Sequence, residues 1–170
     1  IVAGDGPERI GLERLAAELG IRDAVDFLGQ LAQEQAEHAL GAAWVQAVPS
    51  RWEEPFGLVA AEAMMRGTAV VASESGGLAE QVEPGATGYL APAGDASALA
   101  RALEQVVRDR DLAERMGASA RVRALAEAIG FLVRAPEQFD EQRAADVEGL
   151  VHVRVHLGVV VHGCAGDVAQ

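Results

Sequence analysis

Two glutamates around the start of a predicted helix are the residues whose types and spacing most directly suggest chemistry. Glu54 lies in a turn-rich loop, and Glu62 lies more than a turn into the helix that follows. The first amides of a helix lack internal partners and carry partial positive charge, so a diphosphate binds there readily. We therefore predict that the N–H groups of Gly57, Leu58 and Val59 face a diphosphate, while the two carboxylates accept hydrogen bonds from hydroxyl groups on either side of it.

The same two carboxylates have competing interpretations. Eight residues at about 1.5 Å of rise would place Glu54 and Glu62 about 12 Å apart if both were helical. That separation exceeds the roughly 5–9.5 Å that glycoside hydrolysis uses, so a hydrolytic pair is disfavoured. From periodicity alone, two solvated surface carboxylates remain the simpler interpretation, because charged side chains usually lie on surfaces. Gly57 favours binding, since a residue without a Cβ lets a ligand approach the backbone closely.

The spacing of apolar residues predicts alternating strands and helices along most of the chain. Strands are expected at residues 1–3, 25–28, 44–48, 68–72 and 88–91, and helices at 8–19, 33–41, 57–66, 78–82 and 112–126, with another helix capped by Asp95. Short apolar strands that alternate with helices indicate a parallel sheet buried on both faces. The predicted fold is therefore α/β, a doubly wound, Rossmann-like parallel sheet.

The texture of the sequence changes after residue 126. Residues 131–146 are charged and weakly periodic, and only 151–161 show the alternation typical of a strand. We therefore expect one domain at residues 1–126 and assign no fold to the tail at 127–170, apart from a possible strand at 151–161.

Composition excludes several classes of function. The 170 residues carry 26 acidic and 14 basic side chains, a net charge of −12, and every basic residue is Arg. Such a surface repels phosphate backbones, so we expect no nucleic-acid partner. With one cysteine, Cys164, no disulfide can form within the chain. No apolar run approaches a membrane span and no leader opens the chain, so we expect a cytoplasmic protein, while membrane association stays open.

Two glycine-rich turns have alternative interpretations. Gly4 and Gly6 follow a predicted strand and open a helix, as in a dinucleotide-binding fingerprint, but Arg9 stands where that fingerprint needs its third glycine. Nicotinamide or flavin binding is therefore disfavoured, and a tight turn that lines a ligand cleft is favoured. Gly76 and Gly77 either cradle an anion through backbone amides or simply form a turn, and the sequence favours neither.

The tail carries a possible metal-binding group. His152, His156, His162 and Cys164 are residue types that bind transition metals, but their spacing matches no established ligand pattern. Polar side chains on the solvent face of an edge strand explain them more simply, so we expect no metal site.

Four segments together resemble one known family. They are VAGDGPE at residues 2–8, FLG at 27–29, PSRWEEPFGLVAAEAMMRGTAVVASESGGLAE at 49–80 and TGYLAPAGD at 87–95. In this order and spacing they closely resemble the C-terminal domain of family 4 glycosyltransferases of the GT-B fold. The resemblance covers about residues 1–126, and the combination is far more specific than any one segment.

The resemblance implies transfer of a sugar from a nucleotide diphosphate sugar to an acceptor, with retention at the anomeric carbon. It implies that Glu54, the catalytic glutamate, holds donor-sugar hydroxyls, and that the backbone of Phe56–Val59 contacts the sugar and diphosphate. It further implies that Glu62 binds the ribose and that Gly4 and Gly6 line the donor cleft. No metal or cofactor is expected beside the donor substrate.

Departures from the family pattern limit what these residues are expected to do. The family's N-terminal domain, and an Arg and a Lys that contact the diphosphate, would lie upstream of Ile1. We therefore expect an N-terminal domain, or a separate chain that supplies it, as a partner, and little turnover from these residues alone. Two alternatives remain: a non-catalytic module that binds a sugar nucleotide or a partner, and half of a nucleotide-sugar epimerase.

Overall fold

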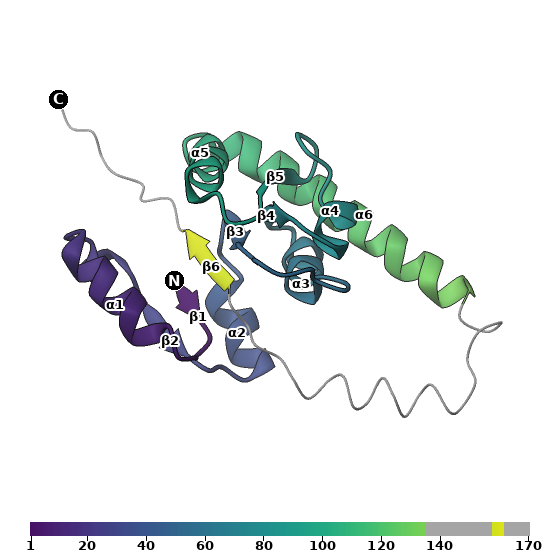
Figure 1. Ribbon diagram of the computed structural model, residues 1–170. Coiled ribbons are helices and arrows are strands. Elements are labelled where there is room, and N and C mark those ends of the chain that lie inside the picture. The colour runs from purple at the N-terminus through teal and green to yellow at the C-terminus, as the bar shows by residue number, and fades with distance from the viewer. Residues whose placement is uncertain (135–157, 162–170) are drawn as a thin grey trace.

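The computed structural model describes residues 1–134 and 158–161, which form one sheet covered by helices (Figure 1). The strands are β1 (Val2–Ala3), β2 (Phe27–Gly29), β3 (Val45–Val48), β4 (Ala69–Glu74), β5 (Gly88–Pro92) and β6 (Gly158–Val161). The helices are α1 (Arg9–Glu18), the 3₁₀ turn η1 (Arg22–Ala24), α2 (Gln33–Leu40), α3 (Leu58–Arg66), α4 (Gly77–Gln81), α5 (Ala96–Val107) and α6 (Arg110–Arg134). The α/β fold predicted from the sequence is confirmed.

The sheet has the strand order β2-β1-β6-β3-β4-β5. β1 pairs with β2, and β4 with both β3 and β5, in parallel, as predicted. β6 runs antiparallel to both of its neighbours, β1 and β3, and Figure 1 shows it between the N-terminal elements and the rest of the sheet. A strand with neighbours on both sides is not an edge strand, so that expectation is wrong for residues 158–161. Residues 151–157 of the predicted strand lie outside the described residues.

Two apolar clusters cover the two faces of β3 and β4. On one face, Met64 of α3 and Leu78 of α4 pack with Val70 and with two alanines from the middle of α6, Ala120 and Ala124. On the other face, Val106 of α5 and Met116 of α6 pack against strand residues such as Val45 and Val71. Alternate residues of a strand point to opposite faces, so Val70 and Val71 necessarily belong to different clusters. This packing fixes the carboxyl end of β3, which leads into one wall of the candidate site.

The N-terminal elements have a smaller core. Ala3 of β1 packs with Ala36 and Leu40 of α2, whereas only Ala16 of α1 is buried. Leu19, directly after α1, is exposed. The β1–α1 turn therefore depends on fewer apolar contacts than the sheet beyond it, and it forms one wall of the site described below.

Helix ends agree with the sequence where a specific side chain defines them. The Asp95 carboxylate accepts a hydrogen bond from the Ala98 N–H at 2.8 Å, which confirms the predicted cap of α5. The end predicted for the last helix is wrong, because α6 continues past Ala126 to Arg134. Weak periodicity does not end a helix, and Gly130 alone costs only about 1 kcal/mol of helix propensity.

The described residues contain neither a membrane-spanning helix nor a cluster of metal-binding side chains. No helix among them is long and apolar enough to cross a membrane. No cluster of three or more His, Cys, Asp or Glu side chains among them is arranged to hold a metal ion. The group of His152, His156, His162 and Cys164 lies outside the described residues.

Candidate functional site

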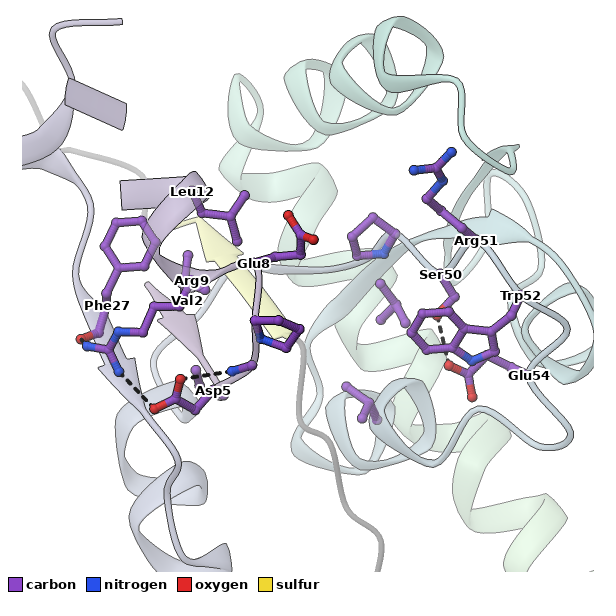
Figure 2. A pocket seen from close by; sticks show the side chains of 17 residues that line it. Val2, Asp5, Glu8, Arg9, Leu12, Phe27, Ser50, Arg51, Trp52 and Glu54 are labelled. Atoms are coloured by element: carbon purple, nitrogen blue, oxygen red, sulfur yellow. Dashed lines mark hydrogen bonds and ion pairs between the residues drawn. The ribbon is translucent and has the colours of Figure 1, made fainter. Parts of the chain in front are cut away.

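A cavity of about 390 Å³ lies between the β1–α1 turn and the loop that follows β3. Gly4 and Gly6 belong to the first wall, while Arg51, Trp52 and Glu54 belong to the second, and Figure 2 shows the labelled side chains in two groups on opposite sides of the view. Both walls follow the carboxyl ends of strands, which is where ligands bind in open α/β sheets. The structure therefore brings Gly4, Gly6 and Glu54 together around one cavity, and their contact with a donor stays a prediction.

The Glu54 carboxylate is held in place by its own loop. The Ser50 hydroxyl donates a 2.8 Å hydrogen bond to Glu54 Oε1, drawn as a dashed line in Figure 2. Ser50 is buried and Glu54 is half-buried. A carboxylate fixed in this way at the cavity wall accepts hydrogen bonds from a ligand without first losing its own freedom of rotation.

The amides at the start of α3 are available to a ligand. Gly57 caps the helix in a left-handed conformation, with φ of 78°, and its carbonyl accepts from the N–H groups of Ala60 and Ala61. No hydrogen bond joins the N–H groups of Gly57, Leu58 and Val59 to any other residue in the described part of the chain. Of these three residues, Val59 lines the 390 Å³ cavity. The predicted set of free helix amides is present.

Gly57 is required for a reason different from the one expected. A Cβ at this position would lie 2.7 Å from Leu78 Cδ2, so the space that the missing side chain leaves is filled by α4. The positive φ adds a second requirement, because residues with a Cβ rarely adopt it. The glycine therefore serves backbone conformation and the packing of Leu78, and close approach of a ligand to its backbone stays a prediction.

Glu62 does not line the same cavity as Glu54. It lines a hollow of about 450 Å³ together with Leu58 and Met65, and also a hollow of about 10 Å³ between α2 and α3. Val59 lines both this small hollow and the Glu54 cavity, so it stands between the two glutamates. Glu62, predicted to bind the ribose, and Glu54, predicted to bind the sugar, thus line different hollows, and Val59 borders both.

Arg66 interacts electrostatically with Glu62. Burial lowers the pKa of the Arg66 guanidinium, and the negative charges of Glu62 and Glu37 oppose that shift. Arg66 also donates a 2.7 Å hydrogen bond to Gln46 Oε1. The Arg66 side chain is therefore held by a hydrogen bond to Gln46 and by attraction to the carboxylates of Glu62 and Glu37.

Gly76 and Gly77 form a turn against the loop that carries Glu54, and not the anion cradle that was the alternative interpretation. The Gly77 N–H donates a 2.7 Å hydrogen bond to the Glu54 carbonyl, so it is not free for an anion. A Cβ at Gly76 would lie 2.3 Å from the same carbonyl oxygen, and one at Gly77 would lie 2.6 Å from the Phe56 carbonyl oxygen. Both glycines are needed because the backbone of the loop carrying Glu54 lies directly against them.

Three residues of the site were not singled out from the sequence. Arg51 and Trp52 line the cavity, and no hydrogen bond or ion pair joins the Arg51 side chain to another described residue. Gln81 donates to the Phe56 carbonyl from α4. Proximity to Glu54 in the chain was a usable signal for Arg51 and Trp52, whereas Gln81 is 25 residues from Phe56 and only the folded chain brings them together.

Comparison with known proteins decides the family. The family model described as "Glycosyl transferases group 1" matches residues 1–123. The chain belongs to this family. The resemblance to the C-terminal domain of family 4 glycosyltransferases of the GT-B fold, inferred from four sequence segments, is thereby confirmed.

Curated relatives of this glycosyltransferase chain are considerably longer. It is 41% identical over 148 residues to the D-inositol 3-phosphate glycosyltransferase of Streptomyces avermitilis, covering 87% of this chain and 31% of that protein. It is 34% identical over 120 residues to the alpha-D-kanosaminyltransferase of Streptomyces kanamyceticus, covering 71% of this chain and 31% of that protein. The chain thus spans about a third of the length of these curated relatives.

Solved structures agree with the family assignment. The sucrose-phosphate synthase of Thermosynechococcus elongatus is 39% identical with a TM-score of 0.69, over 84% of this chain and 37% of that one. HepE of Anabaena, solved in complex with UDP-glucose, is 31% identical with a TM-score of 0.65, over 72% of this chain and 34% of that one. Both similarities support the same GT-B domain fold.

Proposed function

We propose that this chain is the donor-binding half of a retaining glycosyltransferase, which transfers a sugar from a nucleotide diphosphate sugar to an acceptor. The observation that carries the proposal is the meeting of Gly4, Gly6, Glu54 and Val59 around one cavity at the free amino end of α3. The bound UDP-glucose named for the HepE structure is a ligand of this chemical class. The site offers a protein group for the sugar, the diphosphate and the ribose of such a donor.

The donor sugar occupies the cavity beside Glu54, and its diphosphate faces the first N–H groups of α3. The nucleoside then continues past Val59 to Glu62, whose carboxylate accepts hydrogen bonds from the ribose hydroxyls. Val59 and Glu62 are three residues apart, which is about 4.5 Å along a helix axis. The open hollow of about 450 Å³ beside Glu62 has room for the ribose, whereas the 10 Å³ hollow between α2 and α3 holds no more than about one water molecule.

The proposed reaction needs no covalent nucleophile from the protein. The bond between the anomeric carbon and the diphosphate oxygen breaks, and the acceptor hydroxyl oxygen bonds to the same face of that carbon. The proton of the acceptor hydroxyl passes to the leaving diphosphate. Negative charge therefore grows on the diphosphate, and fixed N–H groups stabilise it; removing one such donor from an active site costs roughly 3 kcal/mol in other enzymes.

Arg51 supplies positive charge that the family places elsewhere. The cavity is also lined by the carboxylates of Asp5, Glu8 and Glu54, which would repel an anionic donor. Arg9 lines it too, but its guanidinium is engaged by Asp5 at 3.3 Å. We assign to Arg51 the attraction of the diphosphate into this acidic surrounding.

Donor binding and catalysis are separable in this proposal. A polypeptide of these 170 residues supplies the donor contacts but few groups for an acceptor, so it binds a nucleotide sugar weakly and turns it over little or not at all. Titration with a panel of nucleotide sugars identifies which base and sugar of the donor this site prefers.

Isothermal titration with a panel of UDP- and GDP-sugars tests the proposal. We expect millimolar or tighter binding of at least one member, and weaker binding of its nucleoside diphosphate to Glu62→Ala. Glu114→Ala, which removes an exposed carboxylate on α6, serves as the matched control and should bind as the parent does. Absence of binding by every panel member at millimolar concentration refutes donor binding, and equal affinity in Glu62→Ala refutes the ribose role.

A further inference from the structure

Three carbonyl groups of the loop that carries Glu54, at every second residue, accept hydrogen bonds from α4 and from the turn that precedes α4. The Trp52 carbonyl accepts a 2.8 Å hydrogen bond from the Ser75 hydroxyl, and the Glu54 carbonyl accepts a 2.7 Å bond from the Gly77 N–H. The Phe56 carbonyl accepts from Gln81 Nε2. One short segment, from Ser75 to Gln81, therefore holds three carbonyl groups of the loop.

Gln81 is unusual among the three donors. Its side chain is 5% exposed, and its Oε1 is buried without a hydrogen-bond partner among the described residues. Burial of an unpaired amide oxygen is unfavourable, and an apolar side chain of the same length would avoid it. The residue is therefore explained by what its N–H group does, which is to hold the Phe56 carbonyl.

Holding that carbonyl also orients the next amide. In a trans peptide the C=O and the following N–H point in opposite directions. Because the Phe56 oxygen faces Gln81 in α4, the Gly57 N–H faces away from α4. This is one of the free N–H groups at the start of α3.

We propose that Gln81 is a positioning residue for donor binding: it holds the Phe56 carbonyl so that the Gly57 N–H is presented to the diphosphate. The inference rests on the proposed function, and it adds a residue that contacts the ligand only through the loop. Ser75 and Gly77 hold the preceding carbonyls, so loss of Gln81 frees the end of the loop nearest α3 and loosens the neighbouring hydrogen bond from the Gly77 N–H to the Glu54 carbonyl.

Two substitutions separate hydrogen bonding from space filling. Gln81→Met keeps the length of the side chain but has no donor, so UDP-glucose or the best-bound panel member should bind about tenfold more weakly at every pH. Gln81→Glu can donate to the Phe56 carbonyl only when protonated, and burial raises the pKa of a carboxyl group. Its donor affinity should approach that of the parent at pH 5 and fall as the pH rises through the raised pKa, because the ionised carboxylate repels the carbonyl oxygen.

Titrations of parent, Gln81→Met and Gln81→Glu between pH 5 and 8, together with thermal melts that verify folding, form the test. If Gln81 only fills space, Gln81→Met should bind the donor as tightly as the parent does. In that case Gln81→Glu should bind the donor more weakly, with the same pH dependence as the parent. Either result overturns the inference and leaves the proposed function intact. Hydrogen exchange at the Gly77 amide provides a readout that needs no ligand. Faster exchange in Gln81→Met supports the attachment of the loop by Gln81, and unchanged exchange overturns it.

Failure of the proposed function has a different signature. If the parent chain binds no panel member, donor binding is refuted, and with it the role of Gln81 toward a donor. The exchange experiment then still determines whether Gln81 holds the loop. The two failures are therefore distinguishable from one set of measurements.

Discussion

Replacing Gly77 by alanine tests whether the loop carrying Glu54 is built against α4. A Cβ at this position would lie 2.6 Å from the Phe56 carbonyl oxygen, 2.7 Å from its Cα and 2.8 Å from its carbonyl carbon. All three atoms are backbone, so the new methyl group cannot be accommodated by a change of side-chain rotamer. The loop must move, and the Gly77–Glu54 hydrogen bond of 2.7 Å lengthens or breaks.

Two opposing effects determine the change in the free energy of unfolding of Gly77→Ala. Overpacking costs about 1–3 kcal/mol, and loss of a hydrogen bond about 1 kcal/mol. Alanine in place of glycine within a helix gains up to about 1 kcal/mol. The net expectation for Gly77→Ala is therefore a loss of about 1–3 kcal/mol in the free energy of unfolding.

Urea denaturation followed by circular dichroism measures this difference, with Gly11→Ala as the matched control. Gly11 lies in α1, and a Cβ there would be 3.7 Å from the nearest atom, Glu8 Oε2, which is an ordinary contact. Gly11→Ala should therefore stabilise the chain by up to about 1 kcal/mol. A Gly77→Ala variant that is as stable as the parent, with unchanged donor affinity, would refute the close approach of loop and helix.

Two further predictions concern β6 and the cavity. Val159→Pro removes an N–H from a residue paired with both Val2 and Ala47, so the free energy of unfolding should fall by about 1–3 kcal/mol; an unchanged urea midpoint would show that β6 does not lie between β1 and β3. Arg51→Gln should weaken binding of a nucleoside diphosphate several-fold and make it less sensitive to salt, as measured by titration at 50 and 300 mM NaCl; parent-like affinity at both concentrations would exclude an electrostatic role for Arg51.

Local sequence signals were sufficient for most of the fold. The strand Ala69–Glu74 and the helix Ala96–Val107 follow directly from apolar spacing and from the Asp95 cap. β6 shows the limit of such signals, because alternation indicates a strand but not its neighbours. Its place between β1 and β3 depends on pairing across more than a hundred residues, which no local pattern encodes.

The candidate site divides in the same way. The residue types around Glu54 and the free amides of α3 followed from the sequence, since a helix start has these properties wherever it occurs. The placement of Glu54 and Glu62 on different hollows did not, because it depends on which hollows Val59 and Glu62 of α3 line after packing. The role of Leu78 opposite Gly57 likewise arises only when α4 packs on the loop.

The most direct test of donor binding is a titration of the ¹⁵N-labelled chain with the best-bound nucleotide sugar, followed by amide chemical shifts. The proposal predicts that the largest shifts occur at Gly57, Leu58 and Val59, with smaller changes at Gly4 and Gly6. Saturable binding that leaves these amides unchanged and perturbs a different surface would contradict it.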